Sequence, residues 1–219
     1  MKFKMLSVSL VCVVFAMVFA LSAFAQELQP IKLPEPKLDA NKSLAQALKD
    51  RKTTREYAEA NLSEQTLSNL LWAAFGINRP GSEKRTAPSA LNWQEIAVYV
   101  STTQGIYLYD PKGNALIPVA SGDLRSLTYT QVARFKDAPV DLVYVADMAK
   151  TGAEDARKNL LVAMDTGFVA ENVYLYCASE GLPTGFRVSI PKEKLGQALK
   201  LRPTQMIMGA QSVGLPKDK

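Results

Sequence analysis

The sequence predicts a single α+β domain, because segments with the two-residue period of strands lie between segments with helical spacing. Its 219 residues are 47% hydrophobic and 21% charged, which is ordinary for a globular chain. The chain contains no histidine and only two cysteines, Cys12 and Cys177. These counts exclude histidine-based catalytic triads and cysteine-rich zinc sites, so we expect no metal site.

Residues 1–25 have the pattern of a secretory signal peptide. Lys2 and Lys4 precede an uncharged, mostly apolar run that ends Ala23-Phe24-Ala25. The run is also long enough to span a bilayer, so a retained membrane anchor is the alternative. The Ala-x-Ala ending favours cleavage after Ala25 and therefore a periplasmic or secreted protein.

Cleavage would leave a weakly basic chain with one cysteine. Removing Lys2 and Lys4, and no acidic residue, changes the net charge from +5 to +3. This charge is far below that of a nucleic-acid-binding domain, and no stable membrane insertion is expected after cleavage. Because only Cys177 remains, an internal disulfide is impossible and packing must supply the stability.

The mature chain divides into an arm and a domain. Residues 26–42 contain Pro30, Pro34 and Pro36 and show no regular period. This composition predicts an extended arm lying over the domain, or a linker. Residues 43–219 then form the one predicted domain.

Two helices and a loop open this domain. Ser43 can cap a short helix over residues 43–50, and Ser63 can cap a clearer helix that Gly76 ends. Residues 78–92 combine prolines, a glycine and positive charges, which predicts an ordered loop.

Strands follow in the middle of the chain. Valine, isoleucine and tyrosine alternate with other residues, and turn residues separate the runs. The predicted strands are residues 96–101, 106–109, 115–120 and 140–145.

The longest helix is predicted over residues 154–180, with Gly181 ending it. Apolar and small residues occur nearly all round it, so we expect a buried central helix. A short strand, a helix that begins at Pro191 and a last strand over residues 205–213 complete the chain.

A basic segment follows the first helix. Arg51, Lys52, Thr53 and Arg55 place three cations and a hydroxyl within five residues. Guanidinium groups match phosphate oxygens well, so the segment can bind a phosphate group. The alternative is a solvated basic helix end, which the helix dipole would favour.

The segment around residues 85–92 is unusual for a surface loop. Its small and apolar residues can press backbone against a flat ligand, while Ser89 and Asn92 offer hydrogen bonds. Packing of the loop on its own core is the alternative.

Together these segments resemble the nitroreductase family of flavoproteins, in particular its SagB/ThcOx-type dehydrogenase branch. The resemblance rests on R-K-T-x-R-E-Y, then L-L-W-A-A-F-G-I-N-R-P, R-T-A-P-S-A-L-N-W-Q, V-Y-L-Y-C-A-S-E-G-L and a terminal V-G-L-P. It covers about residues 43–216. The implied fold is a mostly antiparallel sheet flanked by helices, with a long buried central helix, in an intertwined homodimer.

The resemblance also implies FMN bound at the subunit interface. The matched positions that would bind FMN are Arg51, Lys52, Thr53, Arg55, Pro88, Ser89, Ala90, Asn92, Arg187 and Val188. The basic segment would hold the phosphate and ribityl chain, the second segment would lie along the ring, and backbone at Arg187 and Val188 would approach flavin N5. Lys217 and Lys219 occupy the place of a further phosphate contact, and Val188 stands where a glycine is common.

The implied function is an exported FMN-dependent oxidoreductase that transfers hydride or electrons to or from an unidentified small molecule or partner. No catalytic side chain is assigned, because the chemistry belongs to the flavin. The alternatives are a non-enzymatic periplasmic protein that binds flavin or another planar ligand, and a structural domain with an empty cleft.

Overall fold

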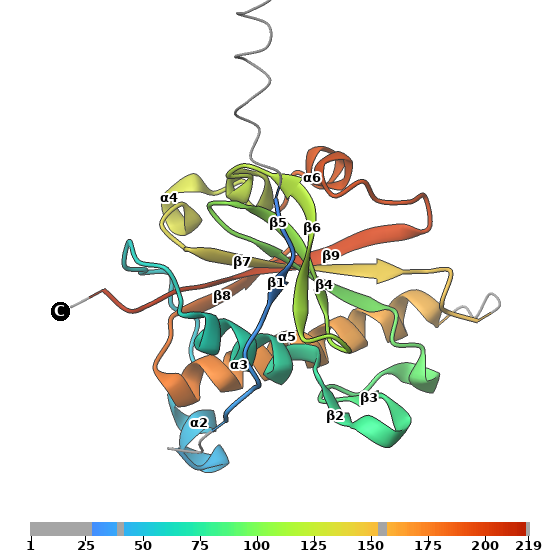
Figure 1. The fold of residues 1–219 in the computed structure, drawn as a ribbon, viewed down its shortest axis with the longest axis horizontal. Coiled ribbons are helices and arrows are strands. Elements are labelled where there is room, and N and C mark those ends of the chain that lie inside the picture. The colour runs from blue at the N-terminus through green and yellow to red at the C-terminus, as the bar shows by residue number, and fades with distance from the viewer. Residues whose placement is uncertain (1–27, 39–41, 153–156, 218–219) are drawn as a thin grey trace, which may run out of the picture.

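The fold is built on a seven-stranded sheet in which every neighbouring pair of strands is antiparallel (Figure 1). The computed structural model describes residues 28–38, 42–152 and 157–217, so the predicted signal peptide lies outside the described residues. The strand order is β1-β6-β5-β4-β7-β9-β8. The strands are β1 (Ile31–Lys32), β4 (Ile96–Ser101), β5 (Gly105–Asp110), β6 (Ala115–Ser121), β7 (Val140–Asp147), β8 (Thr184–Arg187) and β9 (Gln205–Val213). The predicted fold class is confirmed.

Helices cover both faces of this sheet. In Figure 1, α3 and α5 lie on one face, with α2 beside one end of α5, while α4 and α6 lie on the other face. Their bounds are α2 (Leu44–Asp50), α3 (Glu64–Phe75), α4 (Val132–Phe135), α5 (Lys158–Glu180) and α6 (Lys192–Ala198). Within the described ranges, no helix has the length and apolarity needed to cross a membrane.

Local capping explains where the predicted helices begin and end. The Ser43 hydroxyl accepts a hydrogen bond from the Gln46 amide at 3.2 Å, and the Ser63 hydroxyl accepts one from the Thr66 amide at 3.0 Å. Gly181 ends α5 with a φ of 71°, a left-handed conformation that glycine adopts at no steric cost.

Two segments differ from the sequence-based expectation. The N-terminal arm joins the sheet, because Ile31 and Lys32 pair with β6. The expected loop at 78–92 instead contains a hairpin of β2 (Ile77–Arg79) and β3 (Lys84–Arg85), followed by a short 3-10 helix η3 (Ala90–Asn92). The hairpin strands are mostly polar and two or three residues long, so no alternation marks them.

The core lies on both faces of the sheet. All eight residues of the central strand β7 are buried, because helices cover it on both sides. Between the sheet and α3 and α5 lies the larger cluster, which includes Leu70, Leu71, Leu142, Tyr144 and Val173. Under α6 lies the smaller cluster, which includes Ile106, Val143, Val145, Leu195 and Ala210.

Helix α5 is buried on one side and exposed on the other. Val169 and Val173 face the core and are fully buried. Leu160, Met164 and Phe168 remain 60%, 48% and 41% exposed. These three residues recur every four positions and therefore share a helix face. The expected burial thus holds for the side facing the sheet, while an apolar stripe is uncovered in a single copy of the chain.

A buried ion pair joins β7, β8 and β9. The Arg187 guanidinium donates hydrogen bonds to Asp141 at 2.7 Å, to the Ser212 hydroxyl at 2.7 Å, and to the Thr128 hydroxyl and carbonyl at 2.7 and 2.8 Å. Its Cζ lies 4.2 Å from the centre of the Phe135 ring. Arg187 is 7% exposed and Asp141 is fully buried. Each charge therefore depends on the other, since neither reaches bulk water.

This network predicts a large effect for Asp141→Ala. The substitution leaves the Arg187 charge buried without its counter-ion, and we expect a loss of about 3–5 kcal/mol in the free energy of unfolding. Urea denaturation measures this loss. The matched control is Glu83→Ala, which removes an exposed partner of Lys112 and should cost less than about 1 kcal/mol. Equal losses for the two variants would contradict the account.

Candidate functional site

The basic segment of residues 51–55 runs beside strand β8. The Thr54 amide donates a hydrogen bond to the Thr184 carbonyl at 2.9 Å. At Gly185, an added Cβ would stand 3.4 Å from side-chain atoms of both Arg55 and Thr53, so these side chains pack directly on the strand backbone. The segment is therefore held in place by β8 and is not a free helix end.

Tyr174 on α5 connects this segment to β8. Its hydroxyl accepts a hydrogen bond from the Phe186 amide at 2.9 Å and lies 3.0 Å from the Thr53 hydroxyl. The Arg51 guanidinium stands over the Tyr174 ring, with its Cζ 5.5 Å from the ring centre. The bridging position of Tyr174 depends on three distant segments, and no local pattern marks it.

The cations of the segment lack counter-ions. Arg51, Lys52 and Arg55 form no salt bridge with the part of the chain that the structure describes. The Arg55 Nε is buried and has no hydrogen-bond partner there. The Arg55 Cζ lies 5.6 Å from the Phe135 ring centre, and that ring also contacts Arg187. Such an arrangement is suited to an anionic ligand.

Lys52 faces a cavity of about 560 Å³ between α2, the end of α5 and the C-terminal segment. Thr54 and Lys217 also line this cavity, so the structure places the predicted terminal cation close to the basic segment. Lys219 lies outside the described residues.

The second predicted segment, residues 88–92, lies at the other end of α5. The Ala90 amide donates a hydrogen bond to the Asp165 carboxylate at 2.8 Å. Pro88 and Asn92 are exposed, and they line a different cavity of about 340 Å³. The structure therefore orders this loop but does not join it to the basic segment.

The separation of the two segments follows from the helix that supports both. Asp165 and Tyr174 are nine positions apart on α5, which corresponds to about 14 Å along the helix axis. In Figure 1 the β2–β3 hairpin, next to the loop in sequence, lies at the opposite end of α5 from α2. One chain thus presents two partial binding surfaces.

The two remaining predicted residues end strand β8. The Arg187 side chain points into the fold, where it forms the ion pair with Asp141, so this side chain is not available to a ligand. Val188 is 61% exposed. The predicted approach of this backbone to flavin N5 remains a prediction.

A pair of carboxyl groups beneath the loop was missed from sequence. Glu95 is fully buried and Asp165 is 3% exposed. Burial, and to a lesser degree the Asp165 charge, raise the pKa of Glu95 to about 7. Glu95 follows the loop directly, but Asp165 comes from α5, so no sequence motif joins them.

The free cysteine and the possible metal ligands are further candidates for functional groups. Burial raises the pKa of the Cys177 thiol well above its ordinary value, which agrees with the predicted role as a core residue. Among the described residues, no group of three or more histidine, cysteine, aspartate or glutamate side chains is arranged to hold a metal ion.

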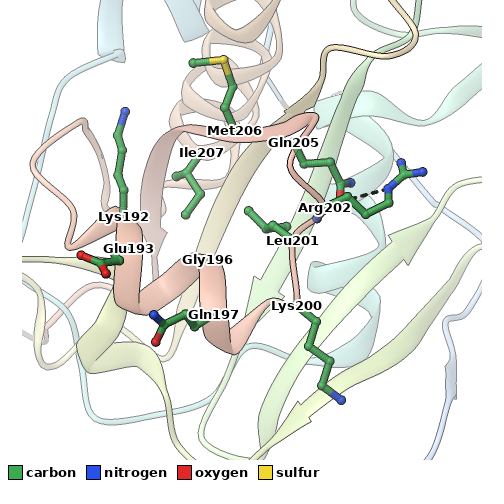
Figure 2. Close-up of a pocket in the computed structure, with 10 residues that line it drawn as sticks. All are labelled: Lys192, Glu193, Gly196, Gln197, Lys200, Leu201, Arg202, Gln205, Met206 and Ile207. Carbon is green, nitrogen blue, oxygen red and sulfur yellow. Dashed lines mark hydrogen bonds between the residues drawn. The ribbon is translucent and has the colours of Figure 1, made fainter.

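A further hollow of about 470 Å³ lies beside α6, on the opposite face of the sheet (Figure 2). Lys192, Lys200 and Arg202 line it, and Arg202 is paired with Gln205 and Asp147. None of the predicted site residues borders this hollow, so we exclude it from the candidate site.

Comparison with known proteins identifies the family of this chain. The model of the nitroreductase family matches residues 48–215. A nitroreductase-like protein of Methanocaldococcus jannaschii, MJ1384, is 26% identical over 175 residues, which cover 75% of this chain and 88% of that protein.

Solved structures show the same fold. A nitroreductase-like protein from Ralstonia eutropha JMP134 is 35% identical, with a TM-score of 0.81, over 90% of this chain and 94% of that one. A chain of the Escherichia coli microcin synthetase McbBCD complex is 24% identical, with a TM-score of 0.70, over 90% of this chain and 81% of that one. By its family model, its identity to the Ralstonia protein and its fold, this chain belongs to the nitroreductase family of oxidoreductases.

Proposed function

We propose that this protein is an exported FMN-dependent oxidoreductase whose cofactor sites are completed by pairing two copies of the chain. The observation that carries the proposal is the cluster of Arg51, Lys52 and Arg55, which forms no salt bridge with the described residues and contains the buried Arg55 Nε, without a hydrogen-bond partner among them. A buried donor without a partner costs free energy, and a bound phosphate or flavin oxygen would remove that cost.

The residues of the basic segment fit the charged part of FMN. A phosphate monoester carries nearly two negative charges, and guanidinium and hydroxyl groups bind its oxygens. Arg51 and Thr53 would hold this group, and Tyr174 orients Thr53 while supporting the Arg51 guanidinium. Lys217 would add a further charge from the C-terminal segment.

FMN, when bound, supplies hydride or electron transfer at N5, so no protein acid or base is obligatory. Arg55, which ends the basic segment and packs against β8 at Gly185, would stabilise negative charge on the cofactor. Because the flavin would perform the chemistry, the site needs no histidine, and the sequence contains none.

Two observations support the pairing of two copies. The segments predicted to bind FMN are about 14 Å apart along α5 in one chain. The apolar stripe of Leu160, Met164 and Phe168 is exposed on the same helix. Packing α5 against α5 of a second copy would cover the stripe and bring the 88–92 loop of that copy toward the basic segment.

Within the family, the motif order favours the SagB/ThcOx-type branch. The likeness to a chain of a microcin synthetase complex supports this placement through the fold alone. The substrate and the electron donor are an unidentified small molecule or partner protein.

The alternative is a periplasmic protein that binds flavin or another planar ligand without turnover. The observation that favours it is Val188, which replaces the glycine common near flavin N5 and is 61% exposed. The two proposals differ in one measurement, since an enzyme reduces its FMN with a donor and reoxidises it with an acceptor, whereas a binding protein does neither at a useful rate.

The first prediction concerns retention of the flavin. Purified protein mixed with FMN and passed through gel filtration should keep a flavin absorption spectrum. Arg51→Ala with Arg55→Ala removes two charge-assisted contacts and should weaken FMN binding about 100-fold or more. The control is Lys192→Ala with Lys200→Ala, which removes two cations at the α6 hollow (Figure 2). A colourless wild-type protein would overturn the FMN proposal.

The second prediction concerns the apolar stripe. Phe168→Glu places a charge in the proposed interface, so sedimentation should show a monomer that has lost FMN affinity. Val132→Glu is the matched control, because Val132 is 58% exposed on a helix away from the stripe. Retention of the dimer by Phe168→Glu would contradict the proposed interface.

The third prediction concerns export. Mass spectrometry of the protein recovered from the cell envelope should find a chain that begins at Gln26. Ala25→Arg removes the small residue required at the cleavage point and should leave the full-length chain. A wild-type protein recovered in the cytoplasm at full length would contradict export with cleavage.

A further inference from the structure

Beneath the 88–92 loop, two carboxyl groups meet inside the protein. Glu95 precedes strand β4 and is fully buried, and Asp165 on α5 is 3% exposed. The proposed FMN contacts of the basic segment do not involve either group. Two neighbouring buried carboxylates would repel each other, so both cannot remain ionised at low cost.

The pair contacts the loop at two points. The Asp165 carboxylate accepts the Ala90 amide hydrogen bond at 2.8 Å. The Ser89 hydroxyl donates to Glu95 Oε2 at 3.2 Å and itself accepts a hydrogen bond from the Gln94 amide at 2.8 Å. The two carboxyl groups therefore hold the adjacent loop residues Ser89 and Ala90.

The loop needs such anchoring because its backbone is strained. Leu91, Asn92 and Gln94 have φ values of 49°, 57° and 47°. These left-handed conformations are unfavourable for residues other than glycine. Strained backbone persists where surrounding contacts hold it, and such sites often contact ligands.

The remaining oxygen of Glu95 indicates where the proton lies. Glu95 Oε1 is buried and has no hydrogen-bond partner in the described part of the chain. The Asp165 side chain is within hydrogen-bonding reach of Glu95. A proton on Glu95 supplies a donor for the Asp165 side chain, which also accepts the hydrogen bond from the Ala90 amide.

We propose that Glu95 and Asp165 share one proton and act as positioning residues that fix the conformation of the 88–92 loop. The importance of the loop for ligand binding rests on the proposed function, whereas the shared proton and its effect on the loop do not.

Other charged groups near the loop do not neutralise the pair. Arg85 donates its Nε hydrogen bond to the Gln94 side chain, and Lys150 binds the Gln94 carbonyl. Asp147 contacts Glu95 through its backbone amide and directs its carboxylate to Arg202. The charged side chain that raises the pKa of Glu95 is Asp165.

The shared proton makes the loop sensitive to pH. The pKa of Glu95 is raised from its ordinary value of 4.5 to about 7 by burial and then by Asp165. Because the folded state holds this proton more tightly than the unfolded state, the stabilisation falls as pH rises from about 4.5 to about 7. Above that range Glu95 is ionised inside the protein, and the loop should open more often.

Amide hydrogen exchange tests this inference on protein without added FMN. Protection of the Ala90 and Gln94 amides, corrected for the intrinsic effect of pH, should fall by up to about tenfold per pH unit between about pH 4.5 and about pH 7, and should level off above pH 7. Glu95→Gln keeps the shape and the donor to Asp165 but cannot ionise, so its protection should not fall. Glu193→Gln, which changes an exposed carboxylate on α6, is the matched control and should behave like wild type.

A second measurement observes the proton itself. Infrared difference spectra of wild-type protein with isotope-labelled glutamate should show the carbonyl band of a protonated acid below pH 7, and Glu95→Gln should lack it. The same exchange profile in wild type and Glu95→Gln, or the absence of the band, would overturn the inference.

The result is separable from the proposed function. If the wild-type protein binds no FMN but shows the exchange profile and the band, the proposed function fails and the inference about the loop stands. If FMN binds and Glu95→Gln leaves the pH profile unchanged, the inference fails alone.

Discussion

A buried ionised arginine constrains the architecture around the candidate site. Arg187 is removed from water, so its charge and its donors must be satisfied inside the protein. Asp141 from β7, Ser212 from β9 and Thr128 from the η4 segment (Arg125–Thr128) provide the partners. Once these strands are fixed, β8 offers a rigid edge, and the basic segment is held on that edge through Thr54 and Gly185.

The ring of Phe135 lies close to two guanidinium groups, those of Arg187 and Arg55. Arg187 is neutralised by the protein itself, whereas the neighbouring Arg55 forms no salt bridge with the described residues. Each side-chain nitrogen of Arg187 donates a hydrogen bond, while the Arg55 Nε has no partner among the described residues. The contrast distinguishes a cation that stabilises the fold from one that is available to bind a ligand.

Helix α5 organises the rest of the site. Tyr174 contacts the basic segment, and Asp165 contacts the 88–92 loop. The exposed face of the same helix carries the apolar stripe. One helix therefore determines the spacing of both partial surfaces and the surface through which two copies would join. Under this account, binding of FMN and pairing of chains are coupled, because each site needs both surfaces.

Much of the fold was predictable from sequence, because local patterns encode it. Capping serines marked the starts of α2 and α3, Gly181 marked the end of α5, and residue alternation marked the main strands. The basic segment and the loop were found because their chemistry is concentrated in a few consecutive residues. The nitroreductase-like fold followed from the order of these motifs.

The features that remained hidden depend on residues far apart in the chain. The Arg187–Asp141 pair spans 46 positions and the Ala90–Asp165 contact spans 75. The family resemblance implied that the backbone at Arg187 and Val188 approaches the flavin, and it gave no role for the Arg187 side chain. The direction of its side chain depends on which strands become its neighbours, and that is a property of the folded sheet.

The central claim, that each binding site combines two copies of the chain, is tested most directly by mixing two defective chains. One chain carries Arg51→Ala and Arg55→Ala with an intact loop, and the other carries Ala90→Trp with an intact basic segment. Neither should bind FMN alone, but mixed dimers isolated through two different tags should bind about one FMN each, because one of their two sites is intact. Mixed dimers that bind no FMN would show that a single chain supplies the whole site and would contradict the account.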